Sequence, residues 1–265
     1  LFFASVYSFF MFFFLIVYDL VVFFFVFLLM IRRPPRSTLD RSSAASDVYK
    51  RQAIYNVIEN NNYKYDSVTV YSAYKHLWDY FDIQWLENQR TPNSYELCNV
   101  LFNKLNIEIP EPELFNLSQI FRKGILQHPP GILPNVKTGL EYLSSKYILV
   151  IISDTAFSGG IELRELMKST GIYNHFSYFI FSDEVGSAKP NKLLFEKALE
   201  PFSVLPIEAI HIGDIERTDI VGANNFGMKS IIYKGGGKHK YAVAESNAHY
   251  ILNNWNEIET IFNNL

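Results

Sequence analysis

The sequence predicts an α/β fold in which a parallel sheet is covered by helices on both faces. Four short apolar runs recur in the second half of the chain, and segments with helical periodicity separate them. Strands without polar alternation must be buried on both faces, which is typical of parallel sheets. The four expected strands are residues 147–153, 178–182, 209–214 and 230–234.

Helices are expected between these strands and also ahead of them. The runs GGIELRELMKSTG and NKLLFEKALEPF place apolar residues at three- and four-residue spacing. The part upstream of the first strand has the same spacing, and a Pro-Asn-Ser tripeptide and the stretch IPEPELF are typical helix starts. The stretch HPPGILPN (128–135) marks a boundary. We therefore expect a helical unit at 53–130 and an α/β core at 131–265.

Residues 1–52 differ in composition from the rest of the chain. Eleven of the 23 Phe lie in residues 1–30, and the basic stretch IRRPPRS follows them. An apolar run of this length before a basic cluster is typical of a transmembrane helix, so we expect a continuous helix there. The alternative is that residues 12–18 form a strand of the sheet.

The stretch from residue 30 to residue 52 resembles the translation of sequencing-adapter DNA, and the Phe-rich run resembles translated T-rich low-complexity DNA. We therefore interpret residues 1–52 as a non-native apolar segment and linker, with a membrane anchor as the alternative. The native sequence would then start near Ala53.

The charge and cysteine content exclude several classes of function. Residues 53–265 are mildly acidic, which argues against a nucleic-acid partner. Cys98 is the only cysteine, so the chain has no internal disulfide framework, and we expect a cytoplasmic protein. No protein partner is indicated, and a membrane is a partner only if residues 1–30 are native.

Polar side chains gather where the expected strands end. They are Ser153, Asp154, Thr155, Lys189, Asp214 and Asp219. The carboxyl ends of parallel strands meet at one edge of a sheet, where ligands bind in such folds. Taken singly, each residue has an ordinary interpretation, as a helix cap, a surface lysine or a turn acid.

The joint order of these residues resembles the haloacid dehalogenase-like (HAD) hydrolase superfamily, in its phosphatase branch with a helical cap. The resemblance implies a three-layer Rossmann-like parallel sheet with the cap at 53–130. It implies that Ser153 and Lys189 are catalytic and contact the phosphoryl group, with Asp154 and Thr155 beside Ser153 in substrate binding. Asp154 stands where the family more often has Asn.

The resemblance also implies a metal. Asp214 and Asp219 in GDIERTDIVGANNFGM match the family's fourth motif, whose acids hold Mg²⁺ directly or through water. Carboxylate oxygens are the ligands that Mg²⁺ prefers. A phosphatase needs this metal and a haloacid dehalogenase does not, so the two acids favour a phosphatase.

The family's nucleophile is the first Asp of an Asp-x-Asp-x-Thr motif, and residues 53–265 contain no such motif. Asp19 follows an apolar run, but Val21 and Phe23 stand where the second acid and the Thr belong. Asp19 is therefore not the nucleophile of a working motif.

We expect a Mg²⁺-dependent phosphatase that acts on a small phosphorylated metabolite through an aspartyl-phosphate. We also expect the sequence to be truncated, so that the chain as written is poorly folded or inactive. The alternatives are a haloacid dehalogenase and a membrane-tethered, phosphate-binding pseudoenzyme.

Overall fold

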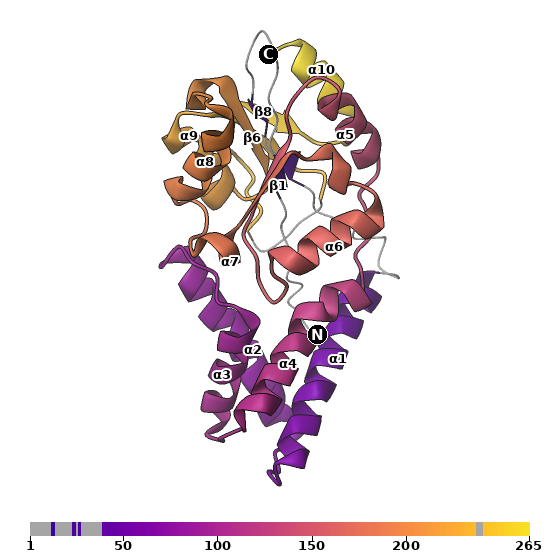
Figure 1. Cartoon of the computed structure of the whole chain (residues 1–265), viewed down its shortest axis with the longest axis vertical. Coiled ribbons are helices and arrows are strands. Elements are labelled where there is room, and N and C mark those ends of the chain that lie inside the picture. The colour runs from indigo at the N-terminus through magenta and orange to yellow at the C-terminus, as the bar shows by residue number, and fades with distance from the viewer. Residues whose placement is uncertain (1–11, 14–22, 25, 28–38, 237–240) are drawn as a thin grey trace.

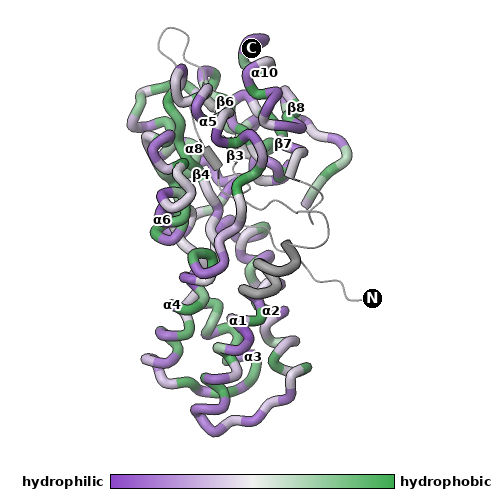
Figure 2. The backbone as a smooth tube through the Cα atoms, turned by 90° about the vertical axis from the view of Figure 1, so that its right-hand side faces the viewer, coloured by the Kyte–Doolittle hydropathy of each residue, from purple (hydrophilic) through white to green (hydrophobic). Residues whose placement is uncertain are grey.

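A computed structural model describes residues 12–13, 23–24, 26–27, 39–236 and 241–265, with side chains from Asp47 onward. These residues form two parts that lie one above the other (Figures 1 and 2). The lower part is a bundle of four helices, and the upper part combines parallel strands with helices on both sides.

The helical bundle consists of α1 (Leu39–Asn60), α2 (Ser67–Leu86), α3 (Ser94–Leu105) and α4 (Glu111–Gln127). The Pro-Asn-Ser start is confirmed, because the Asn93 side chain accepts a hydrogen bond from the backbone N–H of Glu96 at 2.9 Å. The start in IPEPELF is confirmed as well. The boundary expected after residue 52 falls inside α1, which is continuous through it.

The upper part contains the expected strands. They are β4 (Val150–Ser153), β5 (Tyr178–Phe181), β6 (Ala209–Gly213) and β7 (Lys229–Tyr233), followed by β8 (Tyr250–Leu252). The pairs β4–β5, β6–β7 and β7–β8 are all parallel. Nearly every residue of β4, β6 and β7 is buried, as their apolar sequences require.

Helices cover both faces of these strands, which confirms the α/β class. One side carries α5 (Val136–Ser144), α6 (Gly160–Thr170) and α10 (Ile258–Asn263), and the other carries α8 (Lys192–Leu199) and α9 (Val221–Phe226) (Figure 1). The four-residue helix α7 (Ser182–Val185) follows β5 directly.

The described residues of the N-terminal segment are strands, so a continuous helix there is wrong. In β1 (Phe12–Phe13), Phe13 pairs antiparallel with Ile151 of β4, and β2 (Phe23–Phe24) pairs parallel with β6. The strand β3 (Val26–Phe27) pairs with β1. Phe and Val fit a pleated surface, and the facing edges of β4 and β6 have backbone groups that need partners.

The alternative, a strand of the sheet at residues 12–18, is confirmed only in part. Residues 12–13 pair with β4, but the strand beside β6 is formed by residues 23–24. Residues 14–18 lie outside the described residues. Asp19 also lies outside them. In the part of the chain that the structure describes, no helix is long and apolar enough to cross a membrane.

Each of the two parts has its own apolar core. One lies between the strands and their covering helices, and the other fills the helical bundle. The bundle core also includes Phe157, Ala188 and Ile215, which come from loops at the carboxyl edge of the strands. The bundle therefore packs directly on the edge where the sequence predicts a site.

Candidate active site

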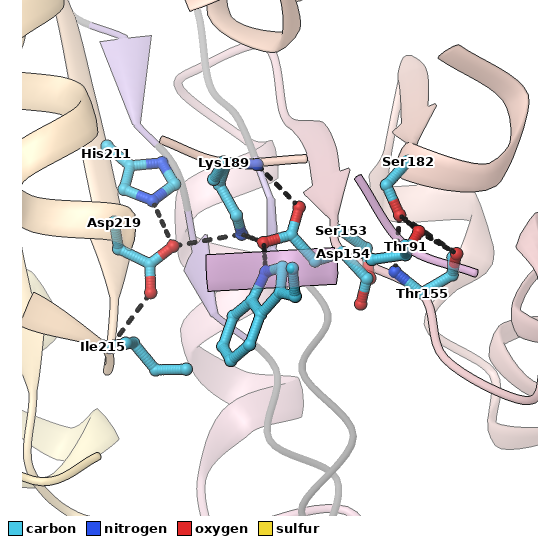
Figure 3. A network of polar contacts seen from close by, with 10 residues as sticks. Thr91, Ser153, Asp154, Thr155, Ser182, Lys189, His211, Ile215 and Asp219 are labelled. Atoms are coloured by element: carbon cyan, nitrogen blue, oxygen red, sulfur yellow. Dashed lines mark hydrogen bonds and ion pairs between the residues drawn. The ribbon is translucent and has the colours of Figure 1, made fainter. Parts of the chain in front are cut away.

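The predicted site residues meet where β4 and β6 end, at the edge of the strands that faces the helical bundle. Lys189 lies between two carboxylates, with its ammonium nitrogen Nζ 3.0 Å from Asp219 Oδ1 and 3.9 Å from Asp154 Oδ2 (Figure 3). The side chains of Lys189 and Asp219 have no exposed surface. A buried ammonium needs such partners, because removing an unpaired charge from water costs several kcal/mol.

Asp219 is the centre of this network. Its Oδ1 also lies 3.1 Å from His211 Nε2, and its Oδ2 accepts a hydrogen bond from the backbone N–H of Ile215 at 3.0 Å. Burial alone would raise the pKa of Asp219, but Lys189 and His211 outweigh it and lower that pKa. Burial lowers the pKa of His211 to about 4, so this imidazole is neutral at pH 7.

Asp154 joins the core to the helical bundle. Its Oδ2 accepts a hydrogen bond from the indole Nε1 of Trp85 at 2.9 Å, and its Oδ1 accepts one from the backbone N–H of Lys189 at 3.0 Å. Burial raises the pKa of Asp154, and the positive charge of Lys189 opposes that shift. Asp154 thus contacts both the ammonium group and the backbone N–H of Lys189.

Asp214 is the residue best placed to bind a metal. It follows β6 directly and is 5% exposed. Burial, and after it the charge of Asp219, raises the pKa of Asp214 well above its usual value. A divalent cation would offset the repulsion between these two carboxylates.

This donor set fits Mg²⁺, which is commonly held by one or two carboxylates, with water and phosphate oxygens completing its shell. Asp219 already uses both oxygens in protein contacts, so Asp214 would be the direct ligand. Within residues 39–236 and 241–265, no group of three or more His, Cys, Asp or Glu is placed to hold a metal.

The local fold brings Asp219 back to the strand end. A π-helical turn (Glu216–Ile220) follows β6, and the backbone N–H of Asp219 donates to Ile215 O at 2.8 Å. Gly213 has no side chain where Asp219 approaches, and a Cβ there would lie 2.3 Å from Asp219 Cβ. The Gly-Asp pair is therefore required by close packing as well as by chemistry.

Thr155 belongs to a separate cluster of hydroxyl groups. Its backbone N–H donates to Ser182 Oγ at 2.8 Å, and its own Oγ1 lies 3.0 Å from that oxygen. Thr91 of the helical bundle lies 2.6 Å from the same Ser182 Oγ. Figure 3 shows this cluster beside the charged network, with Ser153 between them.

One short segment of the helical bundle contacts the residues that follow β4, β5 and β6 and the loop before α8. It runs from Trp85 to Thr91. Besides the contacts of Trp85 and Thr91, the carbonyl of Gln89 accepts from the backbone N–H of Ala188 at 2.6 Å. The carbonyl of Leu86 accepts from the guanidinium of Arg217, also at 2.6 Å. We call residues 85–91 the bridging segment.

The structure thus joins Asp154, Lys189 and Asp219 by direct contacts and places Asp214 within electrostatic reach. Ser153 is fully buried beside them, while Thr155 binds the hydroxyl cluster. The sequence reasoning missed His211, Trp85, Thr91 and Ser182. A histidine inside the apolar run AIHIGD was the one available signal, since a buried polar side chain needs a partner.

The chain is similar in sequence to curated phosphatases. A curated glyceraldehyde 3-phosphate phosphatase from Pyrococcus furiosus is 38% identical over 106 residues, which cover 40% of this chain and 42% of that protein. A phosphoserine phosphatase from Thermus thermophilus is 40% identical over 68 residues, which cover 26% and 27%. The chain therefore matches less than half the length of these curated relatives.

Solved structures share the fold. A 2-haloacid dehalogenase from Pseudomonas syringae superposes with a TM-score of 0.58 at 20% identity, covering 83% of this chain and 92% of that one. A HAD phosphatase from Thermococcus onnurineus gives 0.56 at 19% identity, covering 83% and 91%.

The family model described as haloacid dehalogenase-like hydrolase matches residues 66–233. That range is more than half of the chain and contains every residue of the charged network. The chain belongs to the haloacid dehalogenase-like hydrolase family.

Proposed function

We propose that this chain carries the phosphoryl-binding site of a Mg²⁺-dependent phosphatase, with the helical bundle as its cap. The placement of Lys189 between Asp154 and Asp219 at the strand edge supports this proposal above all other observations. A compact ammonium suits phosphate, and the two carboxylates of Asp214 and Asp219 on the segment after β6 suit a divalent metal. A reducing cytosol is the compartment that the single Cys98 suggests.

Each residue has a separate task in this proposal. The Ser153 hydroxyl donates a hydrogen bond to a phosphoryl oxygen, and Lys189 offsets the charge of that group. Asp214 would hold Mg²⁺ directly and Asp219 through water, and the metal would supply further positive charge when bound. Asp219 also fixes Lys189, and neutral His211 contacts the same carboxylate oxygen.

We assign no residue as the nucleophile. The family's chemistry needs an Asp on the strand between β4 and β6, and the described residues of β1, β2 and β3 are Phe and Val. We propose that the chain binds a phosphate monoester without hydrolysing it. The substrate class is a small phosphorylated metabolite, as the names of the curated phosphatase relatives suggest.

Calorimetry with inorganic phosphate and Mg²⁺ tests the binding site. We expect binding that weakens at least about tenfold in Ser153→Ala, the size of one hydrogen bond to a charged group. A matched control is Ser177→Ala, because Ser177 is exposed and lies outside the site. Equal affinity in both variants would place the phosphate elsewhere.

Hydrolysis assays with glyceraldehyde 3-phosphate and phosphoserine, with Mg²⁺ or with EDTA, test the chemistry. We expect no turnover by the chain. Turnover that requires Mg²⁺ would support the assignment as a phosphatase and would refute the proposal that the chain lacks a nucleophile. Chloride release from a 2-haloacid in EDTA would instead establish a dehalogenase.

A further inference from the structure

Tyr241 contacts the cap helix α2 at two points. It lies in the loop between β7 and β8, and its hydroxyl donates to Asp82 Oδ1 at 2.6 Å. Its ring lies edge-on to the Trp85 ring, with the centroids 5.3 Å apart and the planes at 79°. Asp82 and Trp85 are three residues apart, so they share one face of α2. One side chain therefore holds two successive turns of this helix.

The same loop is anchored to the core at its other end. Glu216 Oε1 accepts from the backbone N–H of Asn247 at 2.9 Å and from its side-chain amide at 3.0 Å. The hydroxyl of Ser246 donates to the other oxygen of Glu216. Glu216 is two residues beyond Asp214 and begins the π-helical turn that carries Asp219. The loop thus connects that turn to the cap.

Trp85 connects these contacts to the site. It is 4% exposed, and its indole N–H donates to Asp154 at 2.9 Å. An indole N–H is a single donor in the plane of its ring, so a small rotation of the ring breaks the bond. Phe81 of the same helix also contacts the Trp85 ring, with centroids 6.1 Å apart. Both Tyr241 and Phe81 therefore contact the indole ring of Trp85 and restrict its rotation.

We propose that Tyr241 is a positioning residue, which fixes the indole of Trp85 on Asp154 and thereby orients the cap over the strand edge. Phe81 is itself part of α2, so its contact with Trp85 cannot fix the position of α2 relative to the core. Tyr241 belongs to the core loop and contacts α2 from outside. The consequence for ligand binding rests on the proposed function, whereas the placement of Trp85 does not.

Exchange of the indole hydrogens tests the proposal directly. Trp78, Trp85 and Trp255 give three indole N–H signals in a ¹H–¹⁵N spectrum, and Trp85→Phe identifies the signal of Trp85. In Tyr241→Ala, we expect its hydrogen exchange to become at least about fivefold faster, because one ring contact and one hydrogen bond are both lost. Tyr241→Phe keeps the ring and should show a smaller change.

Tyr80→Phe is the matched control. Tyr80 is on the same helix and donates to Glu96 Oε1 at 2.6 Å, a bond wholly inside the cap. We expect exchange at Trp85 to be unchanged in this variant, and exchange at Trp255 to be unchanged in every variant. An unchanged Trp85 signal in Tyr241→Ala, or an equal change in Tyr80→Phe, would overturn the proposal.

If Tyr241→Ala speeds all three signals together, Tyr241→Phe and Asp82→Asn decide the question. Faster exchange at Trp85 alone in either variant supports the proposal, and no change in both overturns it. Titration of the unsubstituted chain with inorganic phosphate and Mg²⁺ should shift the Trp85 signal. If it does not, the proposed function fails, while the exchange comparison still tests Tyr241.

Discussion

The ammonium of Lys189 lies 3.0 Å from Asp219, and neither side chain has any surface exposed to solvent. This ion pair holds together loops that follow β6 and precede α8. Its removal should therefore affect the whole domain and not only a ligand.

Replacing Lys189 by Met should destabilise the fold by about 3–5 kcal/mol, because it leaves a buried carboxylate without its counter-charge. Urea unfolding at pH 7 measures the change. Lys192→Met is the control, since Lys192 pairs with Glu196 on the surface and is 76% exposed. A loss as small as that of the control would show that Lys189 is not needed for folding.

Asp214→Asn should weaken Mg²⁺ binding without destabilising the fold. Without Mg²⁺, we expect no loss of stability, because the substitution removes a buried carboxylate whose pKa is already raised by burial. With Mg²⁺ at one hundred times its Kd, the unsubstituted chain should gain about 2.7 kcal/mol, and the variant should gain much less. Unfolding curves with MgCl₂ and with EDTA make the comparison. Equal gains would remove Asp214 from the metal site.

Lys50 should make stability rise with pH. It is 4% exposed, its ammonium lies 4.7 Å from the centre of the Phe157 ring, and burial lowers its pKa from 10.5 to about 8. Between about pH 8 and 10.5, the unfolded chain binds more protons, so this contribution increases with pH. Below pH 8, the cost of the buried charge is fully present.

The variant Lys50→Met should therefore be more stable than the unsubstituted chain at pH 7, by up to about 3 kcal/mol. The difference should shrink between pH 8 and 10.5. Urea unfolding across this range measures it, with the exposed Lys75→Met as control. A difference that stays constant with pH would show that Lys50 keeps its ordinary pKa.

Gly213→Ala should destabilise the chain by about 1–3 kcal/mol, because the new Cβ would lie 2.3 Å from the Cβ of Asp219. Gly131→Ala is the control, since a Cβ at Gly131 meets no atom within 4 Å. Unfolding midpoints of both variants provide the test. A neutral Gly213→Ala would mean that Asp219 can move away from the strand end.

The strands of the core were predictable because their signal is local. Each of β4, β5, β6 and β7 overlaps a short, mostly apolar run that polar residues follow. The site residues at their ends were predictable for the same reason, since the end of a buried strand fixes where the next polar side chain lies. That placement needs no knowledge of distant contacts.

The contacts between distant segments were not predictable in this way. Trp85 reads as an ordinary core residue of an amphipathic helix, and its partner Asp154 is 69 positions away. Thr91 and Ser182 are 91 positions apart and have no motif. A strand near the N-terminus was expected only as the alternative, for residues 12–18, and those at 23–24 and 26–27 were missed. An apolar Phe-rich run suits a helix in a membrane and a strand in a sheet equally well, and only the open edges of β4 and β6 distinguish them.

The bridging segment has a consequence for domain exchange. Its four contacts, together with those of Tyr241 on α2, join the cap to five positions of the core, which are Asp154, Ser182, Ala188, Arg217 and Tyr241. An exchanged cap would have to supply a donor for Asp154 and acceptors for Ala188 and Arg217 at the positions of Trp85, Gln89 and Leu86. A chimaera of this protein should therefore exchange the β7–β8 loop together with the cap, because Tyr241 of that loop contacts α2 directly.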